Sequence, residues 1–156
     1  MNNIIDIEYN LKNYEEEAPI PLVEKMVNDV LSYFSKTNVE LSISFVSDDE
    51  IQELNKVWRN KDMPTDILSF VQADNVEEIE FWPSVENDST VLGDLIISLE
   101  AIKRNCINFN VQFDEELDRI LIHGVLHLLG YDHKTNDSLE PMLLLQEKIL
   151  SNIREQ

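Results

Sequence analysis

Cysteine is nearly absent from this sequence, which has Cys106 as its only thiol among 156 residues. A single cysteine can form no internal disulfide, and it excludes a zinc site built from several thiolates. This scarcity favours a reducing compartment, and we expect a cytoplasmic protein.

Long apolar runs are also missing. No stretch approaches the roughly 20 apolar residues that a helix needs to cross a bilayer. The first ten residues, MNNIIDIEYN, lack the basic segment followed by an apolar one that is typical of signal peptides. We therefore expect no contact with membranes.

Positive charge is the third deficiency, because 31 acidic residues outnumber 12 basic ones and the formal net charge is −19. The average field of such a chain repels nucleic acids and anionic lipids. We expect no DNA binding, and any RNA contact requires a local basic cluster. On charge alone such a cluster is more often a solvated loop. The densest candidate is Lys56, Arg59 and Lys61, and a smaller pair is Lys103 and Arg104.

Apolar residues, in contrast, make up 43% of the chain, and 156 residues fit one domain covering 1–156. Alternating apolar positions predict strands, and apolar positions three to four residues apart predict helices. We expect an α+β fold in which a small mixed sheet of about four strands packs with about five helices. The predicted strands cover residues 4–9, 39–46, 66–71 and 91–98, and the predicted helices cover 22–34, 48–57, 98–106, 114–129 and 138–153.

Three further segments have local signals. Ser47 and Glu50 have the spacing of a capping box, in which each side chain bonds the backbone of the other residue. The acidic residues 15–17 are predicted to be a loop. Residues 72–89 are predicted to be a variable loop, with room for an edge strand near residues 79–81.

All three histidines of the chain lie within eleven residues, in HGVLHLLGYDH (123–133). On a helix, His123 and His127 project from one face because positions four apart are neighbours. Gly130 can adopt a left-handed conformation and end the helix, after which His133 can approach the same point. The spacing predicts a metal site on a helix of the C-terminal half and the turn that follows it.

Three neutral imidazoles leave one position of a tetrahedral zinc ion for water or substrate, whereas structural zinc sites usually fill all four positions with protein ligands. An open position predicts a catalytic metal. We expect one Zn²⁺ ion, with iron, nickel and copper as alternatives because imidazole binds them all. A lone histidine would more often be a core residue, but three at this spacing favour a metal.

The spacing also reproduces the ligands and the glycine of the zinc-peptidase motif H-E-x-x-H-x-x-G-x-x-H. Gly124 stands where those peptidases have the glutamate that acts as general base. Glycine has no side chain that could accept a proton. Peptidase chemistry in its usual form is therefore excluded.

These residues resemble a known family, the YbeY-type endoribonucleases, which are also described as ribosomal RNA maturation factors. The similarity spans nearly the whole chain. The departures are Trp58 for a more usual tyrosine and Val71 for a common proline. The matching segments are HGVLHLLGYDH (123–133), LNKVWRNKDMPTDILSF (54–70) and VLGDLIIS (91–98).

The resemblance implies an α+β fold, a metal held by His123, His127 and His133, and a role for Arg59 in activity. It also implies a cytoplasmic enzyme that acts on single-stranded RNA in ribosomal RNA processing, with the small ribosomal subunit as a partner. The planar guanidinium of Arg59 suits phosphate oxygens, so we expect it to neutralise the transition state. The alternative role of Arg59 is a surface salt bridge.

The sequence leaves the proton acceptor open among hydroxide at the metal, a water chain and a carboxylate such as Asp132. It also leaves open whether water or the 2′-hydroxyl of RNA is the nucleophile. We expect Asp132 to orient a histidine or to cap the turn. We expect Asp94 to have a structural role. Thr65, Asp66 and Ser69 are predicted to make turn and strand-end hydrogen bonds, with the lining of a groove as the alternative.

Three functions follow from these observations. The first is a metal-dependent, single-strand-specific endoribonuclease of ribosomal RNA processing and small-subunit maturation. The second is a ribosome assembly factor with a structural metal, which the acidity favours. The third is another metallohydrolase, such as a peptidase with a displaced base.

Overall fold

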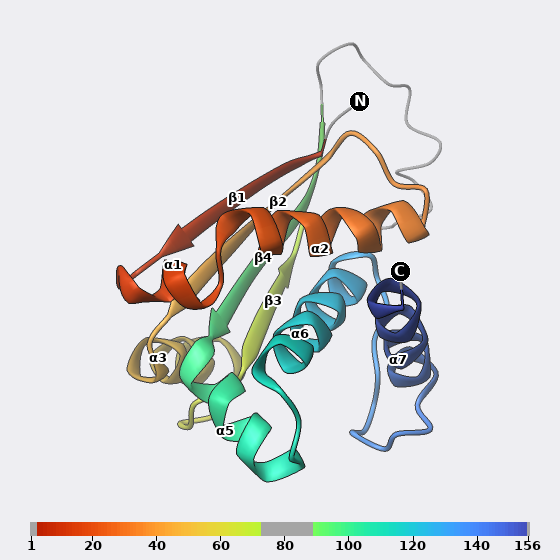
Figure 1. The fold of residues 1–156 in the computed structure, drawn as a ribbon. Helices are drawn as coiled ribbons and strands as arrows, with labels where there is room; N and C mark the ends of the chain where they lie inside the picture. The colour runs from red at the N-terminus through yellow and green to blue at the C-terminus, as the bar shows by residue number, and fades with distance from the viewer. Residues whose placement is uncertain (1–2, 73–88, 156) are drawn as a thin grey trace.

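The computed structural model describes residues 3–72 and 89–155. In this part of the chain, four strands form one mixed sheet in the order β1-β2-β4-β3, and helices cover it (Figure 1). The predicted α+β class is confirmed. The strands are β1 (Ile4–Tyr9), β2 (Val39–Val46), β3 (Ile67–Val71) and β4 (Thr90–Ser98). The helices are α1 (Asn13–Glu17), α2 (Ile20–Tyr33), α3 (Asp48–Arg59), α5 (Leu99–Phe109), α6 (Phe113–Leu128) and α7 (Pro141–Arg154).

The sheet is parallel except at β3, which pairs antiparallel with β4 at one edge. Alternate residues of each strand face opposite sides. Leu41, Ile43 and Phe45 of β2 belong to the main core, as the alternation predicts. Helices α2 and α6 lie over one face of the sheet (Figure 1). On the other face, Ile51 of α3 packs with Leu68 and forms a smaller apolar cluster. The two faces of β3 are therefore covered by different helices.

Helix α7 packs on α6 and brings the C-terminal segment alongside it (Figure 1). Pro141 occupies the first turn, where its missing N–H breaks no helical hydrogen bond. The helix therefore begins three residues later than the predicted start at Ser138. The α6–α7 pair builds the surroundings of the histidines.

The acidic segment at 15–17 was wrongly predicted as a loop, because it belongs to the short helix α1. Tyr14 explains the helix, since its ring is buried and its hydroxyl donates to Glu100 Oε1 at 3.0 Å. This anchor lies 86 residues away in the sequence. A local pattern carries no information on such a contact.

The other elements differ from their predicted bounds by a few residues. Helix α3 continues to Arg59 and helix α5 continues to Phe109, where Asn60 and Asn110 with positive φ angles end them. The edge strand proposed near residues 79–81 lies outside the described residues. None of the described helices is both long and apolar enough to cross a bilayer.

Half of the predicted capping box is confirmed. Ser47 Oγ accepts the Glu50 backbone N–H at 3.2 Å at the start of α3. The Glu50 carboxylate accepts from the Asn10 side chain, which joins α3 to the end of β1. The glutamate therefore serves a contact between elements.

Asp48 in the first turn of α3 ties this helix to the end of β4. Ser98 Oγ donates to Asp48 Oδ1 at 2.8 Å, and the Arg104 guanidinium of α5 donates to both carboxylate oxygens. The Arg104 hydrogen bond is the main reason that the pKa of Asp48 lies below its ordinary 3.8. A carboxyl group whose pKa is lowered in the folded state stabilises the fold at pH values above its ordinary pKa. This stability is lost as the pH falls through the lowered pKa.

We therefore expect Asp48→Asn to lower the free energy of unfolding by about 1 kcal/mol at neutral pH, a small effect because Arg104 is half exposed. The difference between wild type and variant should shrink as the pH falls below about 4. Urea unfolding of both proteins at several pH values measures this, and the other carboxylates cancel in the comparison. A difference that stays constant down to the lowest pH would contradict the prediction.

Candidate metal centre

The three predicted histidines come together at the C-terminal end of α6. His123 and His127 lie one helical turn apart with ring centroids separated by 4.7 Å, and His133 approaches from the following turn at 5.2 Å and 5.4 Å. All three side chains are half-buried, and one ring nitrogen from each lies within 4.8 Å of the other two. Three side chains that can bind a metal thus converge on one point.

Gly130 makes this convergence possible. Its φ of +99° ends α6, as predicted, and only glycine adopts such a conformation at little cost. The Gly130 N–H donates to the His127 carbonyl, and the Tyr131 N–H donates to the Leu126 carbonyl, both at 3.0 Å. These two bonds form a Schellman motif, which satisfies free carbonyls at the helix end and reverses the chain.

The turn itself is held by side-chain hydrogen bonds. Asp132 Oδ1 accepts the His133 backbone N–H at 2.8 Å, so Asp132 caps the turn, one of its two predicted roles. The same oxygen is 4.0 Å from His127 Nδ1, which is too long for a hydrogen bond. Glu140 Oε1 accepts from the Thr135 backbone N–H at 3.2 Å and from its hydroxyl at 3.0 Å. His133 is therefore fixed on both sides.

The Nδ1 atom of each histidine lies within hydrogen-bond distance of an oxygen that can accept a hydrogen bond from it. His127 Nδ1 lies 3.1 Å from the Tyr131 carbonyl, and His133 Nδ1 lies 2.7 Å from the Thr135 carbonyl. His123 Nδ1 lies 2.7 Å from Gln146 Oε1. These acceptors have no proton to give, so Nδ1 carries the hydrogen in all three rings. In a neutral ring, Nε2 is then a free lone pair.

Two of these free nitrogens face each other directly, because His123 Nε2 and His127 Nε2 are 3.1 Å apart. Two lone pairs at this distance repel each other unless a cation lies between them. Two nitrogens bound to one tetrahedral zinc ion at about 2.1 Å are roughly 3.4 Å apart, which is close to the observed separation. The donor set therefore fits a transition metal.

Burial favours the neutral form that binds a metal. Burial lowers the pKa of His123, and a side-chain hydrogen bond with Gln146 and the nearby charge of Asp66 oppose the change. Burial, together with the other two histidines, lowers the pKa of His127 to about 4. Both imidazoles are therefore neutral at neutral pH, as metal ligation requires.

Gly124, the residue that stands in place of the peptidase glutamate, faces the sheet. A Cβ atom at this position would lie 2.7 Å from Ile67 Cδ1 and 2.8 Å from Leu95 Cδ1. Such distances are shorter than van der Waals contact, so α6 packs closely on the sheet at this glycine, and any larger residue would require Ile67 or Leu95 to shift. The missing base thus has a structural reason as well as a chemical consequence.

The two predicted basic clusters have different surroundings. Lys103 and Arg104 pair with Glu17 and Asp48, so the smaller cluster is neutralised. Arg59 is exposed at the end of α3, and within residues 3–72 and 89–155 its guanidinium has no ion pair or hydrogen bond. The salt bridge that was the alternative role of Arg59 does not form in this part of the chain. No direct contact joins Arg59 to the histidines, because α3 covers the opposite face of β3.

The remaining predicted residues mostly make structural contacts. Asp94 accepts from Ser42 Oγ and from Gln72 Nε2, which supports its structural assignment. Asp66 Oδ2 accepts from Asn105 Nδ2 at 3.1 Å just before β3 begins, as expected of a strand-end residue. Ser69 lies opposite Leu95, on the face of the sheet that α6 covers.

Comparison with known proteins decides the family. The family described as Endoribonuclease YbeY matches residues 5–154, which is nearly the whole chain. This chain belongs to that family. The resemblance predicted from three sequence segments is thereby confirmed.

Relatives within the family cover most of the chain. An Endoribonuclease YbeY of Treponema denticola is 37% identical over 150 residues, which are 96% of this chain and 93% of the relative. That of Borreliella burgdorferi strain B31 is 46% identical over 125 residues, 80% of each chain. A solution structure from Thermotoga maritima superposes with a TM-score of 0.62 at 28% identity, and covers 97% of this chain and 90% of the other.

One residue of the site escaped the sequence analysis. Gln146 lies on α7 and is 7% exposed, yet its amide contacts His123 of the histidine cluster. A usable signal was present, because Gln146 falls between Met142 and Ile149 in the apolar stripe of its helix. A polar residue in a buried stripe requires a partner.

Proposed function

We propose that this chain is a metal-dependent endoribonuclease that cleaves single-stranded ribosomal RNA during maturation of the small ribosomal subunit. The activity would reside in a single hydrolase domain of residues 1–156, acting in the cytoplasm. The observation that carries the proposal is the pair of Nε2 lone pairs 3.1 Å apart in a member of the Endoribonuclease YbeY family. That arrangement supports a cation between the two rings, and the family name supports the reaction.

The proposed metal ligands are the Nε2 atoms of His123, His127 and His133. Three neutral imidazoles with an open fourth position are the ligand set of catalytic zinc, so Zn²⁺ is the proposed ion. When bound, such an ion stabilises charge on a phosphodiester oxygen and lowers the pKa of coordinated water towards about 7. The contribution of the chain is to hold the three rings in the required tautomer and direction.

Arg59 is the proposed partner of the phosphate. Its guanidinium carries five donors in a plane that matches two phosphate oxygens, and it has no competing carboxylate among the described residues. Neutralising the charge that develops on the phosphate would accelerate cleavage. Because α3 lies on the far side of the edge strand β3, the RNA would pass around this edge to reach both Arg59 and the histidines.

The surface around Arg59 suits a single strand of RNA. Residues 56–64, at the end of α3 and in the loop after it, are all exposed. Trp58 is 66% exposed and touches Phe70 edge-on, with ring centroids 5.7 Å apart, so one aromatic face is available and fixed in direction. Unpaired bases stack on such faces, whereas the bases of a duplex are already stacked. Lys56 and Lys61 add positive charge beside it.

A ribosome assembly factor with a structural metal is the second candidate, and the net charge of −19 favours it. Strong negative charge weakens the binding of free RNA and leaves docking to a preformed particle. This candidate predicts that chelation melts the fold. It also predicts that a cleavage-deficient Arg59→Ala protein restores ribosome assembly in cells.

The test is cleavage of a labelled single-stranded ribosomal RNA fragment by the purified protein, beside the same fragment in a duplex. We expect cleavage of the single strand only, loss of activity after chelation, and recovery on adding one equivalent of zinc. Arg59→Ala should cleave about 100-fold more slowly, a loss typical of removing one group that stabilises the transition state. Lys148→Ala removes the same charge from an exposed position of α7 and should cleave normally. Equal cleavage of the duplex, or full activity after chelation, would contradict the proposal.

A further inference from the structure

A chain of polar side chains runs behind the metal centre. It begins at His123, whose Nδ1–H donates to Gln146 Oε1 at 2.7 Å. The other end of the same amide, Gln146 Nε2, donates to Glu147 Oε2 at 3.1 Å. A carboxylate only accepts, so this second bond fixes which end of the amide faces the histidine. Gln146 therefore acts as a rigid link.

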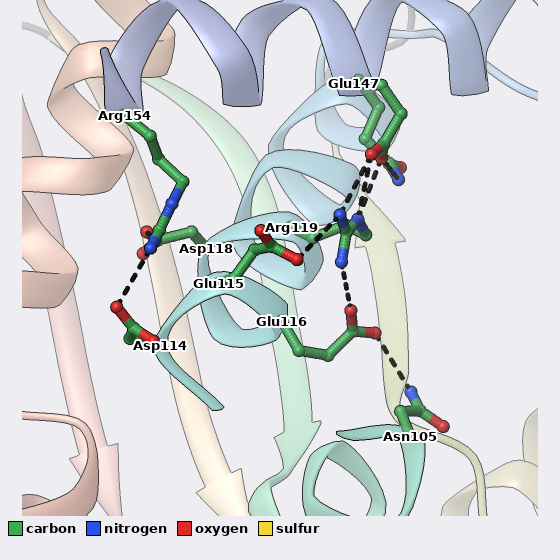
Figure 2. A network of polar contacts seen from close by, with 9 residues as sticks. Asn105, Asp114, Glu115, Glu116, Asp118, Arg119, Glu147 and Arg154 are labelled. Carbon is green, nitrogen blue, oxygen red and sulfur yellow. Dashed lines mark hydrogen bonds and ion pairs between the residues drawn. The ribbon is translucent and has the colours of Figure 1, made fainter. Parts of the chain in front are cut away.

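Arg119 of α6 is the centre of the chain, as Figure 2 shows. Its Nε and Nη2 donate to the two oxygens of Glu147 at 2.9 Å and 3.1 Å, a bidentate pair. Its Nη1 donates to Glu116 Oε1 at 2.6 Å, and its Nη2 also reaches Glu115 Oε2 at 3.4 Å. One guanidinium thus holds three carboxylates, and the cluster carries a formal excess of negative charge.

The chain continues from Glu116 back towards the histidine. Glu116 is only 4% exposed, and its Oε2 accepts from Asn105 Nδ2 at 3.4 Å (Figure 2). Asn105 Nδ2 also donates to Asp66 Oδ2 at 3.1 Å. Asp66 directly precedes Ile67, whose side chain lies against Gly124 beside His123. The polar chain therefore extends from His123 through α6 and α5 to the start of β3.

Stability alone does not account for these residues. A buried network of charges is often no more stabilising than apolar side chains of the same volume, and the stripe of α7 around Gln146 is otherwise apolar. Groups that accept the outer N–H of a metal-binding histidine have a known effect. They fix its tautomer and raise its basicity as a ligand.

We propose that Gln146, backed by Glu147 and Arg119, is the positioning residue of the metal centre, holding His123 with Nε2 directed at the ion. The inference rests on the metal site of the proposed function and adds residues that the ligand pattern does not contain. Negative charge behind the ring makes its Nε2 a better donor to a cation. Gln146 acts through His123 and need not touch the RNA.

The experiment measures binding of Zn²⁺ and Co²⁺ to the full-length protein by competition with a chelator, together with the absorption spectrum of the Co²⁺ form. Gln146→Leu keeps the size of the side chain and removes the acceptor. We expect it to bind either metal about 10- to 100-fold more weakly. Gln146→Glu retains an acceptor and should bind within about threefold of wild type, with an unchanged Co²⁺ spectrum. Gln52→Leu, a matched change in α3, should have no effect on metal binding.

Each outcome decides a separate question. Wild-type protein that binds neither metal would reject the proposed metal site, whereas tight binding by wild type and by Gln146→Leu alike would reject only the positioning role. Equal weakening in Gln146→Leu and Gln146→Glu would also reject it, because that result indicates a packing effect. If Gln146→Leu does not fold, Glu147→Gln provides the test from a half-exposed position. It should bind metal several-fold more weakly, and wild-type affinity in this variant would overturn the proposal.

Discussion

Replacement of His127 by alanine is expected to reduce RNA cleavage by at least about 1,000-fold and metal affinity by more than about 100-fold. Groups that only support a metal ligand contribute 10- to 100-fold to affinity, so the loss of a ligand itself should exceed that range. The fold should survive, because alanine is the best helix former and position 127 lies in the last turn of α6. The His127→Ala protein should therefore lose its activity and keep its fold.

Three measurements on wild type and His127→Ala protein prepared identically check this expectation: cleavage of labelled single-stranded RNA, bound zinc and thermal unfolding. Asn136→Ala is a suitable control, since this residue is exposed and its side chain makes none of the hydrogen bonds that hold His133. Cleavage at the wild-type rate by His127→Ala would show that the activity belongs to a contaminant. Loss of the fold together with the metal would favour the assembly factor with a structural metal.

The sheet could be predicted because its residues obey a local rule. Alternating apolar residues in β1 and β2 are required wherever one face of a strand is buried, and they are visible without knowledge of the partner strand. Helix α1 could not be predicted, because five residues have no readable period and the helix depends on Tyr14 contacting Glu100. Long-range anchors of this kind override local propensity.

The histidine cluster could be predicted for the same reason, since helical geometry alone places His123 beside His127 and Gly130 allows the turn. The supporting residues could not. Gln146 reaches the site because α7 packs on α6, and Arg119 is linked to it through Glu147 of the same helix α7 (Figure 2). Arg59 is an intermediate case, because the resemblance named it and the structure shows it exposed, without placing it against the histidines.

The glycine at position 124 separates two enzyme classes that share a ligand spacing. In the peptidase motif this position supplies a base, and here the same position is the contact between α6 and the sheet. Any side chain at this position requires the terminal methyl groups of Ile67 or Leu95 to shift, and a longer side chain requires a larger shift. The peptidase alternative is therefore opposed by packing as well as by the missing carboxylate.

We accordingly expect Gly124→Glu, which restores the complete peptidase motif, to unfold the protein without creating a peptidase. Overpacking costs about 1–3 kcal/mol, and a carboxylate buried without a partner adds several kcal/mol. The sum reaches the total stability of an ordinary domain, about 5–15 kcal/mol.

Gly124→Ala separates the two costs, because it adds no carboxylate and its gain in helix propensity of about 1 kcal/mol offsets part of the overpacking. It should fold with up to about 2 kcal/mol less stability in urea unfolding. If Gly124→Glu instead folds, binds zinc and cleaves an unstructured protein, then the close packing of α6 on the sheet is not what distinguishes this site from a peptidase.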